Sequence, residues 1–174
     1  MHSMPFIIHA MSEADWTAVA QIYADGIATG EATFETEVPT WETWHAGRLP
    51  HSRFVARSEA GEVVGWAALS AVSSRCVYAG VAEVSVYVAP ASWGQGIGKQ
   101  LLQTLIDSSE AAGIWTLQAG IFPENVTSVT LHEKLGFRVV GRREKLGQQY
   151  GRWRDVLFLE RRSQIVGVGV DATE

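Results

Sequence analysis

The chain has 174 residues and a formal net charge of -5. That length suits one domain with one hydrophobic core, and the negative charge argues against binding nucleic acid, which needs a basic surface. The sequence has no run of about 18 apolar residues, so we expect no membrane span and no membrane partner. Residues 1–16 lack a cationic segment followed by a long apolar one, so we expect no signal peptide and a cytoplasmic protein.

Apolar periodicity and turn residues predict alternating strands and helices along the chain. Ser12 and Asp15 resemble a capping box that begins a helix, and Gly113 and Gly136 are typical of helix ends. In chain order, we expect a strand at 6–9, helices at 12–28 and 40–48, a hairpin of strands 53–57 and 62–69, a strand at 81–88, a helix ending near 112, a strand at 115–121, a helix at 125–135, and strands at 137–143 and 153–159. These elements indicate one mixed α/β domain over residues 1–162, followed by a tail at 163–174.

Residues 82–102 join an alternating strand, a glycine-rich turn and an amphipathic helix. At the start of a helix the first backbone N–H groups have no intrahelical partner, which favours binding of a phosphate or pyrophosphate. Glycines let such a ligand approach the backbone closely. The spacing matches neither a Walker phosphate loop nor a Rossmann fingerprint. The residues of the turn are Gly94, Gln95, Gly96, Ile97, Gly98 and Lys99.

The strand at 81–88 carries different side chains on its two faces, because successive residues point to opposite sides. Glu83, Ser85 and Tyr87 share one face, upstream of the glycine turn. Glu83 is a candidate general base, acting directly or through a water molecule. By pattern alone it is equally consistent with a solvated sheet face. The opposite, apolar face holds Ala82, Val84, Val86 and Val88.

Asn125, Ser128 and His132 fall one turn apart on one face of the expected helix at 125–135. A line of polar side chains indicates a polar groove rather than a core stripe. Imidazole exchanges protons near pH 7, since its reference pKa is about 6.5. His132 is therefore a second candidate for proton transfer, although a lone surface histidine gives the same pattern.

Other residues give weaker signals. Arg75 and Tyr78 precede the strand at 81–88, where a guanidinium would suit an anionic substrate group; a solvated arginine is the alternative. The lone Cys76 cannot form an internal disulfide and is expected to be a small, buried side chain. The histidines are scattered without ligand spacing, so we expect no metal site.

Together these motifs resemble the GNAT superfamily of acyl-CoA-dependent N-acetyltransferases, and within it the phosphinothricin and methionine sulfoximine N-acetyltransferase family. The resemblance runs from about Ile7 to Leu159. It implies a mixed α+β fold: a central, mostly antiparallel twisted sheet with splayed central strands, flanked by helices. The segments that carry it are Thr33-Phe34-Glu35, Arg75-x-x-Tyr78, residues 82–88, the Gln95–Lys99 turn, Leu131-His132-Glu133 and Gly151-Arg152-Trp153-x-Asp155.

The resemblance implies acetyl-CoA as cosubstrate and no metal. The backbone of the strand around Val86, Tyr87 and Val88 would pair with the pantetheine arm, and residues 94–99 would hold the pyrophosphate. Asn125 and Ser128 would lie along the CoA arm.

The implied reaction is acetylation of the α-amine of a small amino-acid analogue such as phosphinothricin or methionine sulfoximine. Glu83 resembles the family's catalytic carboxylate and would deprotonate the substrate ammonium. His132 stands where most of the superfamily has a tyrosine, and would act as an acid toward the leaving thiolate or as a second base. The implied substrate-binding residues are Phe34, Glu35, Ser73, Ser74, Arg75, Tyr78, Glu83, Val84 and Ser85.

The resemblance also implies a homodimer. One residue departs from the family pattern. Gln149 stands where family members often have a lysine, which leaves the preferred substrate open. A GNAT enzyme acting on another small amine or on a peptide N-terminus is the first alternative. A non-catalytic acyl-CoA-binding regulatory module is the second.

Overall fold

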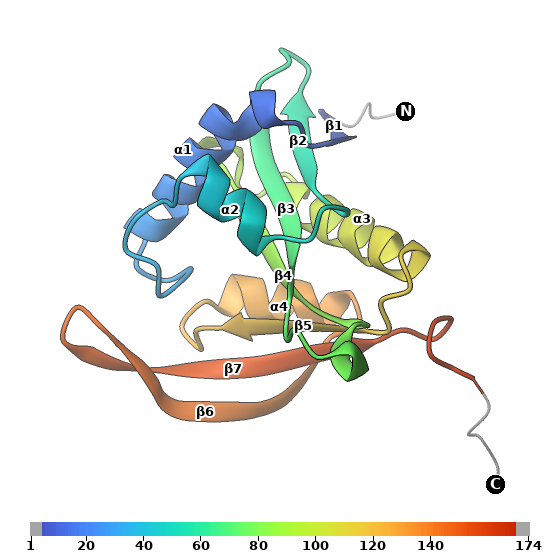
Figure 1. Cartoon of the computed structure of the whole chain (residues 1–174). Helices are drawn as coiled ribbons and strands as arrows, with labels where there is room; N and C mark the ends of the chain where they lie inside the picture. Colours follow the sequence, from blue (N-terminus) through green and yellow to red (C-terminus); the bar gives the residue numbers. More distant parts are fainter. Residues whose placement is uncertain (1–4, 170–174) are drawn as a thin grey trace, which may run out of the picture.

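The computed structural model describes residues 5–169, and its centre is a seven-stranded sheet (Figure 1). The strands lie in the order β1-β2-β3-β4-β5-β7-β6. Neighbours are antiparallel except β4 and β5, which are parallel, so the mostly antiparallel mixed α+β fold is confirmed. The strands are β1 Phe6–Ala10, β2 Phe54–Ser58, β3 Val63–Ala71, β4 Val81–Val88, β5 Thr116–Ile121, β6 Arg138–Gln149 and β7 Arg152–Arg162.

The two parallel strands, β4 and β5, pair only where each begins. Residues 81–83 lie opposite residues 116–118. Beyond Glu83, β4 stays paired with β3 as far as Val88, whereas β5 stays paired with β7 as far as Ile121. The central strands therefore splay, as the resemblance implied, and the edge of β4 that faces β5 is left without a strand partner in the described chain.

Helices cover both faces of the sheet: α1 Trp16–Ala28, α2 Trp41–Gly47, α3 Ile97–Ala111 and α4 Val126–Lys134. Figure 1 shows α1 and α2 on one side of β3 and α3 on the other. The core beneath α3 includes Leu101 and Val84, whereas the core beneath α1 and α2 includes Trp44 and Trp66, with Tyr87 packed against it. The two-faced pattern of residues 82–88 is therefore confirmed.

The helix signals in the sequence correspond to real termini. The Asp15 carboxylate accepts a hydrogen bond from the Ser12 N–H at 2.9 Å, which completes the expected capping box ahead of α1. Asp15 also pairs with Arg57 of β2. Gly113 and Gly136 follow α3 and α4 with positive φ angles of 84° and 93°, a conformation that glycine adopts without strain.

Two expectations differ from the structure. β6 and β7 are much longer than predicted and meet at a tight turn at Tyr150 and Gly151. The prediction was too short because much of β6 is an exposed polar edge strand, which has no apolar alternation to indicate a strand. The expectation that Cys76 is buried is wrong. It lies in a short 3-10 turn, Cys76–Tyr78, on the exposed connection between β3 and β4.

The chain after β7 begins with a contact to the residue just before β5. Ser163 is buried and its N–H donates to the Trp115 carbonyl at 2.8 Å. The last part of the expected tail, residues 170–174, lies outside the described residues. No helix between residues 5 and 169 is both long and apolar enough to cross a membrane.

Candidate active site

A cavity of about 390 Å³ opens where β4 and β5 part. Its walls come from β4, β5, α4, the loop after α1 and the β6–β7 hairpin. Segments far apart in the sequence therefore meet around one space, and both candidates for proton transfer reach it. The sequence-predicted site residues that line the cavity are Phe34, Glu35, Glu83, Val84, Ser85, Val86, Tyr87, Asn125, Ser128 and His132.

Glu83 stands where the two strands separate. It is the last residue of β4 in register with β5, opposite Gln118, and its side chain is exposed. The Gln118 amide donates a hydrogen bond to Glu83 Oε2 at 3.3 Å. The carboxylate is thus oriented by a neutral partner and remains accessible, so it can accept a proton from a bound molecule or from water.

His132 lies in the last turn of α4 and is buried, with its ring set edge-on to Phe137 at a centroid distance of 5.0 Å. Its Nδ1 lies 2.7 Å from the Ser128 carbonyl oxygen. A carbonyl only accepts hydrogen bonds, so Nδ1 carries the proton and the neutral ring has an unprotonated Nε2. Burial lowers the pKa of His132, and the Ser128 carbonyl offsets part of that effect. The imidazole is therefore neutral near pH 7.

The glycine turn leads into α3 with open backbone. Gly94 and Gly96 have φ angles of 79° and 82°, and a Cβ at either would meet no atom within 4 Å. The Trp93 indole N–H donates to the Val88 carbonyl at 2.9 Å, which ties the turn to the end of β4. The first turn of α3 has no acidic side chain. This helix start therefore presents free N–H groups, open space and no opposing negative charge.

The start of α4 connects to the loop after α1. Asn125 caps α4, where its Oδ1 accepts a hydrogen bond from the Ser128 N–H at 3.2 Å. Its Nδ2 donates to the Glu31 carbonyl at 3.3 Å. Asn125, Ser128 and His132 face the cavity together, so the polar line read from the sequence does form a polar wall.

The predicted substrate-binding residues fall into two groups. Phe34, Glu35, Val84 and Ser85 line the cavity together with Glu83. Ser73, Ser74, Arg75 and Tyr78 are not among the lining residues. They lie on the β3–β4 connection, where Arg75 Cζ sits 5.6 Å from the centroid of the Tyr78 ring.

Two arginines that the sequence analysis did not identify line the cavity, whereas Arg75 does not. Arg48, just after α2, and Arg143, on β6, both line it. Arg143 lies over the Phe158 ring with Cζ 4.8 Å from the centroid. No periodicity marks these positions, since one follows a short helix and the other lies in a charged run of β6.

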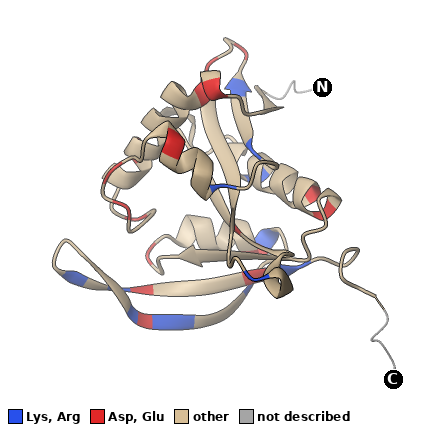
Figure 2. Ribbon diagram, viewed as in Figure 1, with Lys and Arg blue, Asp and Glu red and all other residues tan. Residues whose placement is uncertain are grey.

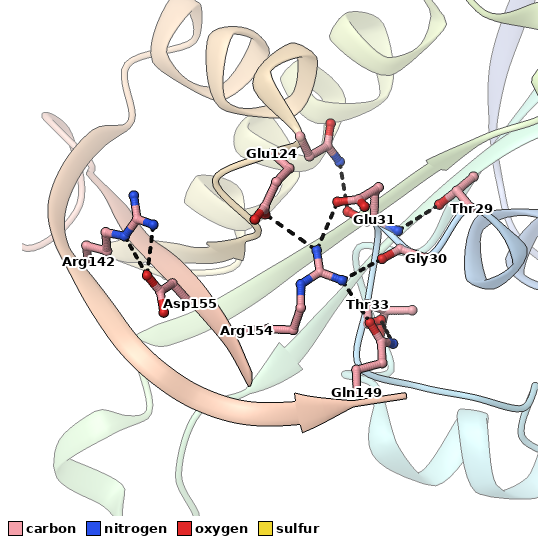
Figure 3. Close-up of polar contacts among 10 residues, drawn as sticks. Thr29, Gly30, Glu31, Thr33, Glu124, Arg142, Gln149, Arg154 and Asp155 are labelled. Atoms are coloured by element: carbon pink, nitrogen blue, oxygen red, sulfur yellow. Dashed lines mark hydrogen bonds and ion pairs between the residues drawn. The ribbon is translucent and has the colours of Figure 1, made fainter. Parts of the chain in front are cut away.

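Arg154 of β7 joins the hairpin to the loop after α1 (Figure 3). Its Nη1 donates to the Gly30 carbonyl at 2.8 Å. Its Nη2 pairs with Glu31 at 2.9 Å and with Glu124 at 3.4 Å. The guanidinium carbon lies 3.9 Å from the centroid of the Phe122 ring. One buried side chain thus contacts segments on two sides of the cavity.

Gln149 is a structural partner of Arg154. It is buried, accepts a hydrogen bond from Arg154 Nη1 at 3.1 Å and donates to the Thr33 carbonyl at 2.8 Å. The next residues along the loop are Phe34 and Glu35, which line the cavity. The amide at 149 therefore helps to hold the loop.

Charged residues of both signs line the cavity. Figure 2 shows acidic residues on the loop after α1 and residues of both signs on the β6–β7 hairpin. The Arg154 ion pairs join these two regions. Among the described residues, no group of His, Cys, Asp and Glu side chains has the arrangement of a metal site.

Comparisons with known proteins agree on one family. Residues 16–137 match the model of the acetyltransferase (GNAT) family. Over 152 residues the chain is 33% identical to the L-methionine sulfoximine/L-methionine sulfone acetyltransferase of Pseudomonas paraeruginosa, covering 84% of this chain and 88% of the relative.

Solved structures give the same result. A GNAT superfamily phosphinothricin acetyltransferase from Sinorhizobium meliloti, in complex with acetyl-CoA, is 31% identical with a TM-score of 0.85, covering 98% of this chain and 93% of that one. A ribosomal-protein-alanine N-acetyltransferase from Brucella melitensis is 33% identical with a TM-score of 0.83, covering 90% and 99%. The chain therefore belongs to the acetyltransferase (GNAT) family, as its motifs indicated.

Proposed function

We propose that the protein transfers the acetyl group of acetyl-CoA to the α-amine of a small amino-acid analogue such as phosphinothricin, methionine sulfoximine or methionine sulfone. The observation that carries this proposal is the meeting of Glu83 and His132 in one cavity at the point where β4 and β5 part. The relatives named for these substrates support it, since they span most of the chain.

The residues present fit acetyl-CoA. Residues 94–99, which form the glycine turn and the start of α3, offer the free N–H groups and open space that a pyrophosphate needs, and a Cβ at Gly96 would occupy part of that space. The unpaired edge of β4 beyond Glu83 offers the backbone groups of Val86 and the N–H of Val88, whose carbonyl accepts from Trp93, to the amides of pantetheine. Asn125 and Ser128 would lie along the same arm. When bound, acetyl-CoA supplies a thioester whose thiol leaves readily, since thiol pKa values are about 8.5.

Glu83 is the proposed general base. The α-ammonium of an amino acid must lose a proton before its nitrogen can attack a carbonyl carbon. The exposed Glu83 carboxylate, oriented by Gln118, accepts that proton directly or through a water molecule. Ser85 and Val84 lie beside it on the cavity wall and would contact the acceptor.

His132 is the proposed second base. The sequence left open whether it acts as an acid or as a base. Its Nδ1 proton is held by the Ser128 carbonyl and its pKa is lowered by burial, so the neutral ring has a lone pair rather than a proton at Nε2. That state favours accepting a proton over donating one, and a proton taken from the attacking nitrogen would then pass to the departing thiolate.

A homodimer is part of the proposal. Figure 1 shows the closed end of the β6–β7 hairpin extending beyond the other elements. Large apolar side chains on this ribbon are exposed, as is typical of a protein interface. Light scattering on wild type and on Trp153→Glu tests this: a dimer converted to monomer supports it, and a monomeric wild type contradicts it. The exposed side chains are Val139, Val140, Leu146, Tyr150 and Trp153.

The test of the proposed function is thiol release from acetyl-CoA with phosphinothricin, methionine sulfoximine, methionine sulfone, plain amino acids and peptides as acceptors. Turnover of the amino-acid analogues, with a product heavier by one acetyl group, supports the proposal. Turnover of peptides alone would favour an activity like that named for the Brucella relative. Tight acetyl-CoA binding without turnover would favour a regulatory module.

A further inference from the structure

Arg48 brings a positive charge to the cavity wall on the side of α2. Its half-buried side chain lies near the rings of Trp44 and Trp66, with Cζ 5.7 and 6.0 Å from their centroids. Its Nη1 donates a hydrogen bond to Ser70 Oγ at 2.6 Å. Burial raises the pKa of Tyr23, another lining residue, and the nearby charge of Arg48 opposes that rise. The guanidinium is therefore fixed in place and faces the cavity.

Arg48 forms no ion pair within the described residues, although the carboxylates of Glu35 and Glu83 line the same cavity. Its Nε is also buried without a hydrogen-bond partner. A partly buried cation without a counter-charge is unfavourable, because it has lost hydration that no anion replaces. A bound carboxylate would supply that anion and suit the planar guanidinium. The arginines that do form ion pairs in residues 5–169 are Arg57, Arg138, Arg142, Arg154, Arg161 and Arg162.

The β3–β4 register places the hydrogen-bond partner of Arg48 opposite Glu83. Ser70, which holds Arg48, is the residue directly opposite Glu83. Residues opposite each other in antiparallel strands project to the same face, with Cβ atoms about 5 Å apart. The Arg48 guanidinium is thus held by the residue opposite the proposed base, on the same face of the sheet. An α-amino acid carries its carboxylate and its ammonium on one carbon, which suits a cation and a base held by paired residues.

We propose that Arg48 binds the α-carboxylate of a free amino acid and so holds the α-ammonium beside Glu83. This assignment rests on the proposed function and gives the carboxylate-binding role to Arg48 rather than to Arg75. It also narrows the acceptor class. A peptide N-terminus has an uncharged amide next to its α-amine, so it would offer Arg48 no carboxylate to pair with.

The test compares L-methionine sulfone with its carboxamide, which has the same side chain and amine but no negative charge. For the wild type, we expect kcat/KM to favour the acid roughly tenfold to a hundredfold, the range for a hydrogen bond to a charged group. In Arg48→Gln this preference falls toward one, and in Arg48→Lys part of it returns. Arg143→Gln removes a charge from the same cavity and keeps the preference. Circular dichroism and acetyl-CoA affinity check the fold of each variant.

Calorimetric binding of the two ligands in the presence of CoA makes the result independent of turnover. One outcome is that the acid binds more tightly than the carboxamide, that this difference requires Arg48, and that the acid is not acetylated. This outcome would overturn the proposed reaction and support the carboxylate site. Equal binding of acid and carboxamide by the wild type would overturn the carboxylate site. If Arg143→Gln lost the preference for the acid while Arg48→Gln kept it, Arg143 would be the carboxylate-binding residue. That result would overturn the proposal for Arg48 as well.

Discussion

Replacing Arg154 with methionine removes the charge that joins the β6–β7 hairpin to the loop after α1 and keeps a long apolar side chain. The side chain of Arg154 is 8% exposed, so its contacts form in a largely desolvated environment. The variant leaves the Gly30 carbonyl and Gln149 without their donor. We therefore expect a loss of stability and a looser loop.

The size of the loss follows from the separate contacts of Arg154. The hydrogen bond from a charged donor to the Gly30 carbonyl is worth about 1.5 kcal/mol. The guanidinium over the Phe122 ring is worth about 1 kcal/mol. The Glu31 and Glu124 side chains are 49% and 55% exposed, so solvent screens both pairs, which add about 0.5 kcal/mol together. The expected loss is about 3 kcal/mol in the free energy of unfolding.

Urea denaturation measures this loss. With a slope of about 2 kcal/mol per molar urea, the midpoint of Arg154→Met should fall by about 1.5 M. The control is Arg152→Met on the same strand, where the side chain is exposed, and we expect a change within about 0.5 kcal/mol. Amide hydrogen exchange should quicken at residues 29–35, and KM for the amino acid should rise because Phe34 and Glu35 lose their support. Equal midpoints for the two variants would refute this reasoning.

Three further substitutions test other parts of the structure. The pKa of His132 is lower in the folded protein, so the unfolded chain is protonated first as the pH falls below about 6.5, and stability drops there. The urea midpoints at pH 7.5 and pH 5.5 should therefore differ less in His132→Gln than in the wild type. The same difference in both proteins would contradict this. Gly96→Val strains a residue with φ of 82° and fills the proposed pyrophosphate-binding site, so the calorimetric Kd for acetyl-CoA should rise at least about tenfold. An unchanged Kd would count against that binding site. In Gly26→Ala the new Cβ would lie 2.6 Å from the Tyr87 ring, so thermal unfolding should show a loss of about 1 to 3 kcal/mol, whereas Gly47→Ala meets open space and should cost nothing.

The sequence predicted those parts of the site that follow from local pattern. Alternation along 81–88 identified the face of Glu83, and helical spacing grouped Asn125, Ser128 and His132. The run of glycines at 94, 96 and 98 marked the turn before α3, and the structure gives the first two positive φ angles. Each of these signals depends only on neighbouring residues, so each could be read without knowing the fold.

The remaining parts depend on contacts between distant segments. Arg48 reaches the cavity because α2 packs on β3, and Arg154 reaches Gly30 because the hairpin is long enough to pass the loop after α1. Neither position stands out by spacing. The departure at Gln149 was visible in the sequence, but its bond to Thr33 was not, since the two residues are 116 positions apart.

The rate of Glu83→Gln tests the central claim most directly. Glutamine keeps the shape of the side chain and the contact with Gln118 but cannot accept the ammonium proton. With L-methionine sulfone and acetyl-CoA at pH 7.5, we expect kcat to fall at least about a hundredfold, while the Kd for acetyl-CoA stays unchanged. A kcat close to that of the wild type would show that Glu83 is not the base, and would contradict the assignment of this cavity as the acetylation site.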